Sequence, residues 1–376
     1  MVTTILLFLI PLVAWIIIAK LVFKHEFTIE EMSIQAGITA LFLVFIFFIG
    51  YSAAEYDEKI VSGKVTALEP VEKTCKTYWS DSPDSFCTNR YTRQVRNGET
   101  CTTVNNKRSC TPRYKTQYKS VYPWERRYFI NTTLHDFEID RVDPQGANTP
   151  PRFSEVKVDD PVAEKVGYVN YIKAAASTLF NQKLENVPQI SYPNIYDYYH
   201  VDQVFYTDTP APAYLNDWNR QLEYVNSMIR KKEVNVIINV TGKDQNWAEE
   251  LAQSWDAHNI NDVVIVIGVT GEKINWVDVR SWSEEKIANI AIRDEILNLG
   301  IIDKDKINGI ITNDVIKYYK AQPMENFKYL EDDIPPPTWM LVLAGIILLI
   351  VTPTVSYFLS KNDFKSYGPI YKTRRK

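Results

Sequence analysis

Catalytic signatures are absent from this sequence of 376 residues. It contains neither the Gly-x-Ser-x-Gly turn of serine hydrolases nor the His-Glu-x-x-His motif of zinc peptidases. Gly242-Lys243 follows an apolar segment, but a phosphate-binding loop would require glycine at the position of Ile237. The sequence has only 4 histidines, and those of the central region stand alone. The leading hypothesis is therefore a non-enzymatic role.

An excess of positive charge is also lacking. The chain has 42 Lys and Arg against 46 Asp and Glu, which gives a net charge of −4. Domains that bind nucleic acid are usually strongly basic, because the phosphate backbone dominates their affinity. The sequence therefore predicts no nucleic-acid partner.

Long apolar runs are present only near the two ends of the chain, at residues 3–23, 34–54 and 338–359. An α-helix needs about 20 apolar residues to cross the hydrocarbon of a bilayer. None of the runs has a charge at its middle, and the first lacks the basic start and cleavage site of a signal peptide. We therefore expect three transmembrane helices and the lipid bilayer as a partner.

The charges that flank these runs predict the orientation. Residues 360–376 carry six Lys and Arg and one Asp, and such tails stay on the cytoplasmic side of a membrane. The segment between the second and third runs is then extracytoplasmic, either periplasmic or on the cell surface. We expect an integral membrane protein with a large extracytoplasmic domain, a cytoplasmic C-terminus and a short acidic linker, residues 331–337, before the last helix.

The four cysteines fall in one short window after the second apolar run: Cys75, Cys87, Cys101 and Cys110. An even number of cysteines outside the cytoplasm is typical of disulfides. The alternative is a zinc site, but the gaps are longer than those of zinc knuckles, and the window contains no histidine. We favour two disulfides, in any of the three pairings.

Residues 55–140 have the pattern of a small β-rich module around these cysteines. Asn97-Gly98 predicts a hairpin turn, and residues 105–107 predict a second turn. The module contains many Lys and Arg side chains, and two interpretations of them remain open. They either contact an anionic surface, such as lipid headgroups or a polyanion, or form the solvated face of a thin sheet.

Residues 141–161 are rich in turn formers and predict a linker. The next segment, residues 162–213, predicts a helix over Val162–Phe180 and then an aromatic loop over Gln189–Pro212. The loop tyrosines either cover apolar surface or form an interaction surface, because tyrosine is frequent at binding hot spots. These candidate interaction residues are Tyr192, Tyr196, Tyr198, Tyr199 and Tyr206.

Residues 214–330 alternate between amphipathic helices and apolar strands. Helices are expected at 216–231, 246–258, 283–299 and 306–319, with Ser283 capping the third, and strands at 233–240, 262–269 and 273–279. This alternation is typical of an α/β layer with helices on both faces of a sheet. The predicted fold class is thus a membrane-anchored chain with three transmembrane helices, a small β-rich disulfide module and an α/β domain.

The α/β segment resembles the TPM domain, a module found in thylakoid lumen proteins and many bacterial membrane proteins. The matching residues are Leu251–Trp255, Asn261–Val266, Trp276–Val279 and Ile310-Ile311. This chain has Arg280-Ser281-Trp282 where the family usually has a glycine-rich turn. The first module, with Val61–Val65 and the cysteines, resembles uncharacterised membrane proteins of tailed phages and of their bacterial hosts.

The resemblance implies that the domain binds Ca²⁺ or acts as a weak phosphatase, as is reported for some TPM domains. By position, it assigns Asp262 and Asp278 as metal ligands, although either residue also suits turn capping or surface charge. The main hypothesis is a membrane protein that presents this domain for interaction, assembly or modulation of another envelope protein. The alternatives are a weak metal-dependent phosphohydrolase and a phage-encoded envelope modifier that acts in superinfection exclusion or lysis control.

Overall fold

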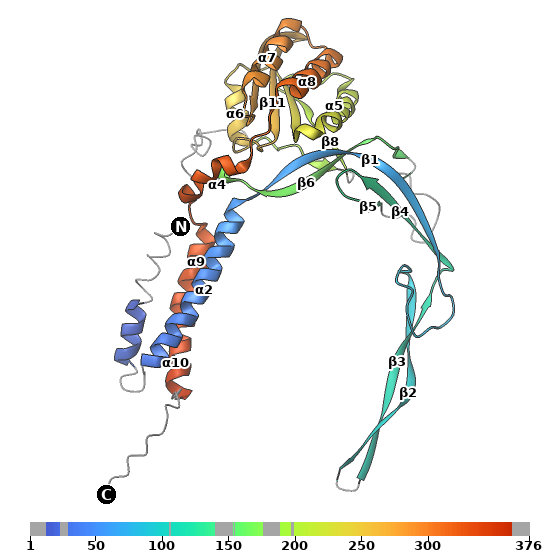
Figure 1. The fold of residues 1–376 in the computed structure, drawn as a ribbon, viewed down its shortest axis with the longest axis vertical. Helices are drawn as coiled ribbons and strands as arrows, with labels where there is room; N and C mark the ends of the chain where they lie inside the picture. Colours follow the sequence, from blue (N-terminus) through green and yellow to red (C-terminus); the bar gives the residue numbers. More distant parts are fainter. Residues whose placement is uncertain are drawn as a thin grey trace.

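The computed structural model describes residues 13–22, 29–104, 107–139, 153, 155–175, 189–196 and 199–362. The described chain has the shape of an arch (Figure 1). Apolar helices extend from one end of the arch, a long two-stranded ribbon extends from the other end in the same direction, and an α/β domain lies on the opposite side of the arch.

Two helical segments are long and apolar enough to cross a membrane, judged by length and composition. They are α2 (Ile29–Glu55) and a continuous helix over 338–359, which consists of α9 (Thr338–Ile346), a π-helical turn η5 (Ile347–Val351) and the start of α10 (Thr352–Asn362). Gly50 allows close packing between them, because a Cβ there would lie 2.2 Å from the Met340 sulfur. Of the third expected span, residues 3–23, the structure describes only residues 13–22, which form the shorter apolar helix Val13–Val22.

The arch is built on one strand, β1 (Tyr56–Thr74), which follows α2 without a loop. Its first half pairs with β6 (Pro161–Val169) and its second half with β4 (Trp124–Thr132), both antiparallel. The β6 pairing ends at Lys64, and a bulge between Val65 and Ala67 interrupts the start of the β4 pairing. Strand β5 (Phe137–Ile139) adds to the free edge of β4. The sheet order is β5-β4-β1-β6. Bulges bend the strand that contains them, which contributes to the curvature of the arch.

The ribbon consists of β2 (Arg90–Val104) and β3 (Lys107–Ser120). The predicted hairpin turn at Asn97-Gly98 is wrong. Pairing continues past it, with Arg96 opposite Tyr114 and Glu99 opposite Pro112, so Asn97 and Gly98 form a bulge. Gly98 has a φ of +82°, the left-handed conformation that such bulges use. The strands instead reverse between Val104 and Lys107, as the second predicted turn requires.

Both predicted disulfides are confirmed, with the pairs Cys75–Cys87 and Cys101–Cys110. Cys101 lies directly opposite Cys110 in the ribbon register. This cross-link holds the hairpin register, since two strands without a hydrophobic face are only marginally stable in water. Cys75 and Cys87 join the end of β1 to the loop before β2, and both are buried.

The predicted helix over Val162–Phe180 is also wrong within the described residues. Its first part is strand β6, which pairs with β1, and only α4 (Tyr171–Ala174) is helical. Pairing with a long partner strand outweighed the weak helical pattern of this segment. The aromatic segment expected as a loop contains β7 (Ile195–Tyr196), β8 (His200–Val201) and β9 (Val204–Thr207), and β9 joins the α/β sheet.

The α/β domain has the helix–sheet–helix arrangement that its sequence predicts. Its sheet has the order β12-β11-β10-β9, in which β9, β10 and β11 are parallel and β12 is antiparallel. The remaining elements are α5 (Leu215–Ile229), η3 (Arg230–Lys232), β10 (Asn235–Thr241), α6 (Trp247–Ser254), β11 (Asp262–Thr270), β12 (Lys273–Ser281), α7 (Ile287–Leu299), α8 (Lys304–Tyr318) and η4 (Met324–Asp333).

Alternate residues of β11 face the two sides of this sheet. Val263 and Ile265 pack with α5, α7 and α8, whereas Val264 and Val266 pack with Trp247 and the rest of α6. A strand buried on both faces reads as a continuous apolar run, which is why the sequence revealed it. Ser283 does not cap α7, which begins only at Ile287; its hydroxyl instead donates to the carbonyl of Lys320.

We predict that mild reduction opens Cys101–Cys110 before Cys75–Cys87. The ribbon disulfide has no core over it, and Arg108 Nη2 lies 3.6 Å from Cys101 Sγ, where a cation stabilises a leaving thiolate. Cys75 and Cys87 are only 5% and 1% exposed. Differential alkylation and mass spectrometry should show the first pair opening at a roughly tenfold lower dithiothreitol concentration. Opening in the reverse order would contradict this assignment.

Candidate functional site

The turn between α6 and β11 is the most strained part of the described backbone. Three consecutive residues other than glycine, Asp256, Ala257 and His258, have positive φ angles of 48°, 72° and 54°. Each left-handed residue of this kind costs roughly 1 kcal/mol, so surrounding contacts must hold the turn. Ala257 is fully buried and accepts a hydrogen bond from Trp282 Nε1 through its carbonyl. Such a turn is a candidate site because strain collects where geometry matters for function.

The Asp262 side chain stabilises this turn through a hydrogen bond from the residue that follows it, Asn259. The Asp262 side chain is fully buried at the start of β11 and accepts hydrogen bonds from three donors. They are the Tyr192 hydroxyl at 2.9 Å, Asn235 Nδ2 at 2.8 Å and the Asn259 backbone N–H at 2.8 Å. The carboxyl therefore joins the strained turn, the neighbouring strand β10 and the aromatic segment.

Burial shifts the pKa values of the acidic and basic groups here in opposite directions. Removal from water raises the pKa of Asp262 to about 7, although its three donors act the other way. Burial lowers the pKa of His258 to about 4, so its imidazole is neutral at pH 7. The Tyr192 hydroxyl, buried beside Asp262, has a pKa well above its ordinary value. A carboxyl that titrates near neutral pH is the most perturbed acid of this junction.

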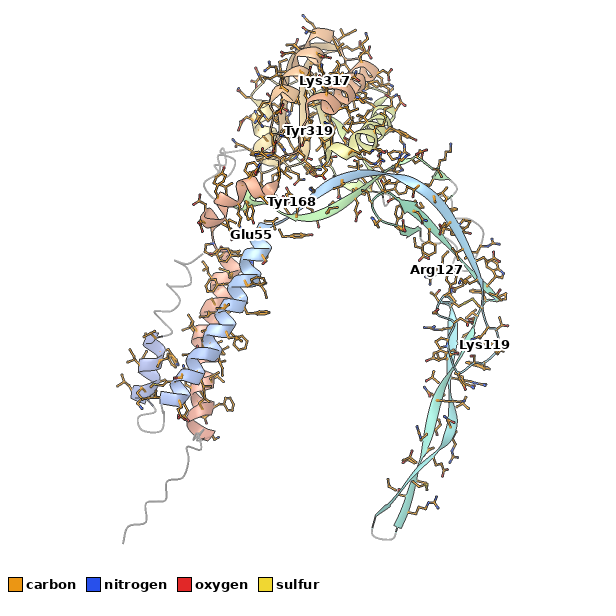
Figure 2. All side chains as sticks on the ribbon, viewed as in Figure 1. Glu55, Lys119, Arg127, Tyr168, Lys317 and Tyr319 are labelled. Atoms are coloured by element: carbon orange, nitrogen blue, oxygen red, sulfur yellow. A yellow bond between two sulfur atoms is a disulfide. The ribbon has the colours of Figure 1, made fainter. Side chains whose placement is uncertain are left out.

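Hydrogen bonds extend from Asp262 toward the apolar helices. Asn259 Oδ1 accepts from the Tyr168 hydroxyl at 3.1 Å, and Asn170 Nδ2 donates both to that hydroxyl and to Asp57 Oδ2. Asp57 lies only two residues after Glu55, the last residue of α2. Figure 2 shows Tyr168 between Glu55 and the α/β domain. A continuous polar network thus connects the end of α2 with the strained turn.

A pocket of about 280 Å³ opens beside this network. Its walls come from β1, β6, the aromatic segment and the strained turn, and they carry charges of both signs: Asp57, Glu58, Lys165, Lys173 and Asp256. Lys173 Nζ pairs with Asp57 at 3.0 Å and Lys165 Nζ lies 3.8 Å from Glu58, so the charges largely satisfy one another. Tyr192 lines the pocket, whereas Asp262 does not. Asp262 accepts a hydrogen bond from the Tyr192 hydroxyl and so positions that side chain.

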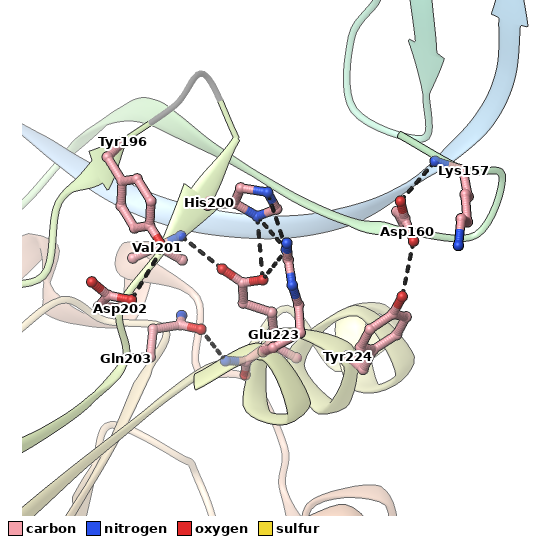
Figure 3. Close-up of polar contacts among 11 residues, drawn as sticks. Lys157, Asp160, Tyr196, His200, Val201, Asp202, Gln203, Glu223 and Tyr224 are labelled. Atoms are coloured by element: carbon pink, nitrogen blue, oxygen red, sulfur yellow. Dashed lines mark hydrogen bonds and ion pairs between the residues drawn. The ribbon is translucent and has the colours of Figure 1, made fainter. Parts of the chain in front are cut away.

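A second polar cluster attaches α5 to the arch (Figure 3). Glu223 is buried and accepts from the Val201 N–H at 3.0 Å and from Arg220 Nη1 at 2.9 Å. The same guanidinium nitrogen lies 2.6 Å from His200 Nδ1. The Tyr224 hydroxyl, also on α5, donates to Asp160 at 2.9 Å, just before β6. This cluster and the Asp262 network together fix the orientation of the α/β domain on the arch.

The two predicted metal ligands are not brought together. Asp278 lies opposite Val266, four residues along β11 from Asp262, which corresponds to about 13 Å. Its carboxylate pairs with Arg280 at 2.7 Å, while the oxygens of Asp262 already face hydrogen-bond donors. Calcium requires six to eight oxygen ligands around one point. Neither residue therefore fits a Ca²⁺ site.

The described residues contain one cluster with three atoms of metal-ligand type, Glu99 with Cys101 and Cys110. Both sulfurs belong to the ribbon disulfide and are not thiolates. Zinc binding by these cysteines, the alternative to disulfides, is therefore excluded for the oxidised protein.

The residues of the predicted aromatic interaction surface differ in exposure, and the interaction role stays a prediction. Tyr199 is 7% exposed, Tyr192 is half-buried with its hydroxyl on Asp262, and Tyr206 is half-buried against the domain core. Tyr196 is 49% exposed. Tyr198 lies outside the described residues. The segment also joins the arch to the sheet, because Val201 packs on Ile60 of β1 and β9 pairs with β10.

An exposed apolar stripe lies instead on α7, on the side of the domain far from the apolar helices (Figure 1). Ile287, Ile290 and Leu297 on the helix are 51%, 48% and 40% exposed, and Ile301 just after it is 57% exposed. The ion pair of Arg293 with Asp294 interrupts the stripe. Sequence reasoning missed this feature because the helix is apolar on both its buried and its exposed sides. Apolar side chains aligned at the surface are typical of contact sites.

No protein-family model, curated protein or solved structure matches the chain. The resemblance to TPM domains therefore remains a prediction from the sequence.

We predict that Asp262→Asn changes how stability depends on pH. The folded-state pKa of Asp262, about 7, lies above its ordinary value of 3.8. The protonated carboxyl is thus favoured by folding, and its contribution is complete below pH 4 and is lost as the pH rises through 7. Wild-type protein should lose roughly 2–4 kcal/mol over this interval relative to Asp262→Asn.

The measurement is denaturant unfolding of the full chain in detergent between pH 4 and 8. Burial lowers the pKa of His258, so this residue has the opposite effect on the pH dependence of stability. Because His258 is present in both proteins, the difference between their stability profiles reports Asp262 alone. The control variant Asp278→Asn changes a partly exposed carboxylate and should keep the wild-type profile. Parallel profiles for wild type and Asp262→Asn would show that the buried carboxyl does not titrate in this range.

Proposed function

We propose that the chain is an integral membrane protein that presents its α/β domain on the extracytoplasmic side for interaction, assembly or modulation of another envelope protein. The observation that carries this proposal is the apolar stripe of α7, at the end of the domain remote from the apolar helices. A surface in this place is accessible to a partner when the helices are in the bilayer. Exposure of several aligned isoleucine and leucine side chains to water is unfavourable, and their burial against a partner would be favourable.

Two further features support the extracytoplasmic location. The two disulfides are typical of oxidising compartments. The basic residues 360–376 favour a cytoplasmic C-terminus by the positive-inside rule. Together they support an outer location for the domain between its two flanking spans.

The geometry does not favour the phosphohydrolase alternative. A metal-dependent hydrolase needs ligands that converge on an open coordination site. Asp262 is enclosed by donors and Asp278 is paired with Arg280, on a different part of the sheet. Among the described residues, the polar groups around the strained turn form a joint between the arch and the domain.

We predict that Ile287→Ser with Ile290→Ser weakens partner binding. Burying the exposed half of each isoleucine is worth about 1 kcal/mol, so the double variant should lose roughly tenfold or more in affinity. Both side chains are about half exposed, so the variant should fold normally. The measurement is quantitative mass spectrometry of proteins that co-purify with the tagged full chain after cross-linking in cells.

Met228→Ser is the matched control, because Met228 is 59% exposed but lies on α5. It should retain the envelope protein that the α7 variant loses. Equal recovery of that protein with both variants would remove α7 as the contact surface. Recovery of no envelope protein with the wild-type chain would count against the proposed function itself.

A further inference from the structure

A second pocket, of about 290 Å³, lies between the arch and the α/β domain. Among the described residues, it shares no lining residue with the pocket beside the strained turn. Strands β1 and β6 pass along the base of the domain and form one wall (Figure 1). The other wall comes from η3 and from residues just before β10 and β11. Ligand pockets usually measure about 300–1,000 Å³, so this one has the size for a small molecule.

Three valines make part of the pocket wall apolar: Val61, Val166 and Val234. In the register of β1 with β6, Val166 lies opposite Lys59, which is two residues from Val61. The two arch valines therefore share one face of the sheet. Val234 belongs to the core of the α/β domain and is 2% exposed. An apolar ligand group would bind here favourably, because it would remove apolar surface of both molecules from water.

Three charged side chains line the same pocket: Lys59, Arg230 and Glu233. Among the described residues, none of the three makes an ion pair. Lys59 Nζ lies 5.4 Å from the centre of the Tyr168 ring, and Arg230 Nη1 donates to the carbonyl of Ser227 at 3.1 Å. Both cations thus keep N–H donors that no described carboxylate accepts from. In the first pocket, by contrast, charges of opposite sign pair with one another.

Glu233 adopts a backbone conformation that glycine usually takes. It ends η3 with a φ of +54°, and its N–H donates to the carbonyl of Arg230 at 2.9 Å. Glycine is common at such left-handed helix ends because it has no Cβ to strain the backbone. The turn alone therefore does not explain a glutamate. Its exposed side chain lies at the pocket wall, where a carboxylate suits a cationic ligand group.

Asn261, at the same wall, has an unsatisfied side-chain oxygen. The residue is 5% exposed, and its Nδ2 donates to the carbonyl of Ile60 at 2.7 Å. Its Oδ1 is buried and accepts from no donor in the described chain. The Asn261 carbonyl accepts from the Asn235 N–H, which places this residue beside Val234 and close to Glu233. Buried acceptors without a donor are rare, and an N–H group of a ligand would supply one.

We propose that this pocket binds a free α-amino acid with an apolar side chain. The ligand side chain lies against the valines, and its carboxylate accepts from Lys59 and Arg230. Its ammonium group donates to Glu233 and to Asn261 Oδ1. A peptide end is a poorer match, because an amide replaces one of its two charges and leaves either the cations or Glu233 without a partner. The inference depends neither on the membrane anchoring nor on the proposed protein partner.

The test is isothermal titration calorimetry of the full chain in detergent, with L-leucine, L-valine and L-phenylalanine as ligands. Three analogues of leucine each lack one group: isocaproate has no ammonium, isoamylamine has no carboxylate, and glycine has no side chain. We expect at least one of the apolar amino acids to bind, and the analogues to bind roughly tenfold more weakly or less. This comparison uses the wild-type chain, so it does not depend on the folding of any variant.

Glu233→Gln, and separately Lys59→Gln with Arg230→Gln, should weaken amino-acid binding by roughly tenfold or more, because each removes a charged partner of the ligand. Lys231→Gln is the matched control. Lys231 is exposed on η3 next to Arg230 but does not line the pocket, so this variant should bind like the wild-type protein.

Binding of none of the three amino acids would overturn the proposal. Equal binding of isocaproate or glycine, tighter binding of a peptide that ends in leucine, or unchanged binding by the pocket variants would each overturn it as well.

Discussion

The continuous passage from α2 into β1 is the constraint on which the rest of the structure depends. No loop separates Glu55 from Tyr56, so the strand leaves the helix in a fixed direction. A strand of 19 residues cannot form a compact sheet alone, and its two halves recruit β6 and β4 as partners. The pairing with β6 places the α/β domain near α2, and the pairing with β4 carries the ribbon away from it.

The buried polar joint makes this arrangement specific. A hydrophobic contact between arch and domain would tolerate many orientations, whereas the Asp262 network and the Glu223 cluster each require matched donors and acceptors. Leaving one of these buried groups unpaired would cost about 1–3 kcal/mol. The strained turn at Asp256–His258 is held between this network and the apolar cluster that includes Ala257 and residues of α2.

Sequence reasoning succeeded where one local signal decided the outcome. The buried strand β11 and the helices around it follow from periodicity alone, and the disulfides follow from cysteine count and context. It failed where a distant segment decided. Asn97-Gly98 is a strong hairpin signal, but in the observed register Cys101 pairs with Cys110 and the strands continue past residue 98. Asn97 and Gly98 therefore form a bulge instead of a turn. Pro161–Val169 is a strand because it pairs with residues 56–64 of β1. Nothing in the sequence near residue 161 indicates this distant partner.

The sequence by itself determined the apolar helices, the cysteine-rich β region and the α/β domain, because burial and chain reversal depend on local patterns. Only the tertiary structure decided the roles of particular side chains. It enclosed Asp262 and Tyr192 in a joint, separated Asp278 from them, and left Ile287 and Ile290 in water. Whether a side chain is exposed, and which side chains lie close together, depends on residues far apart in the chain. Periodicity cannot show which of two apolar helix faces packs on the core and which stays exposed.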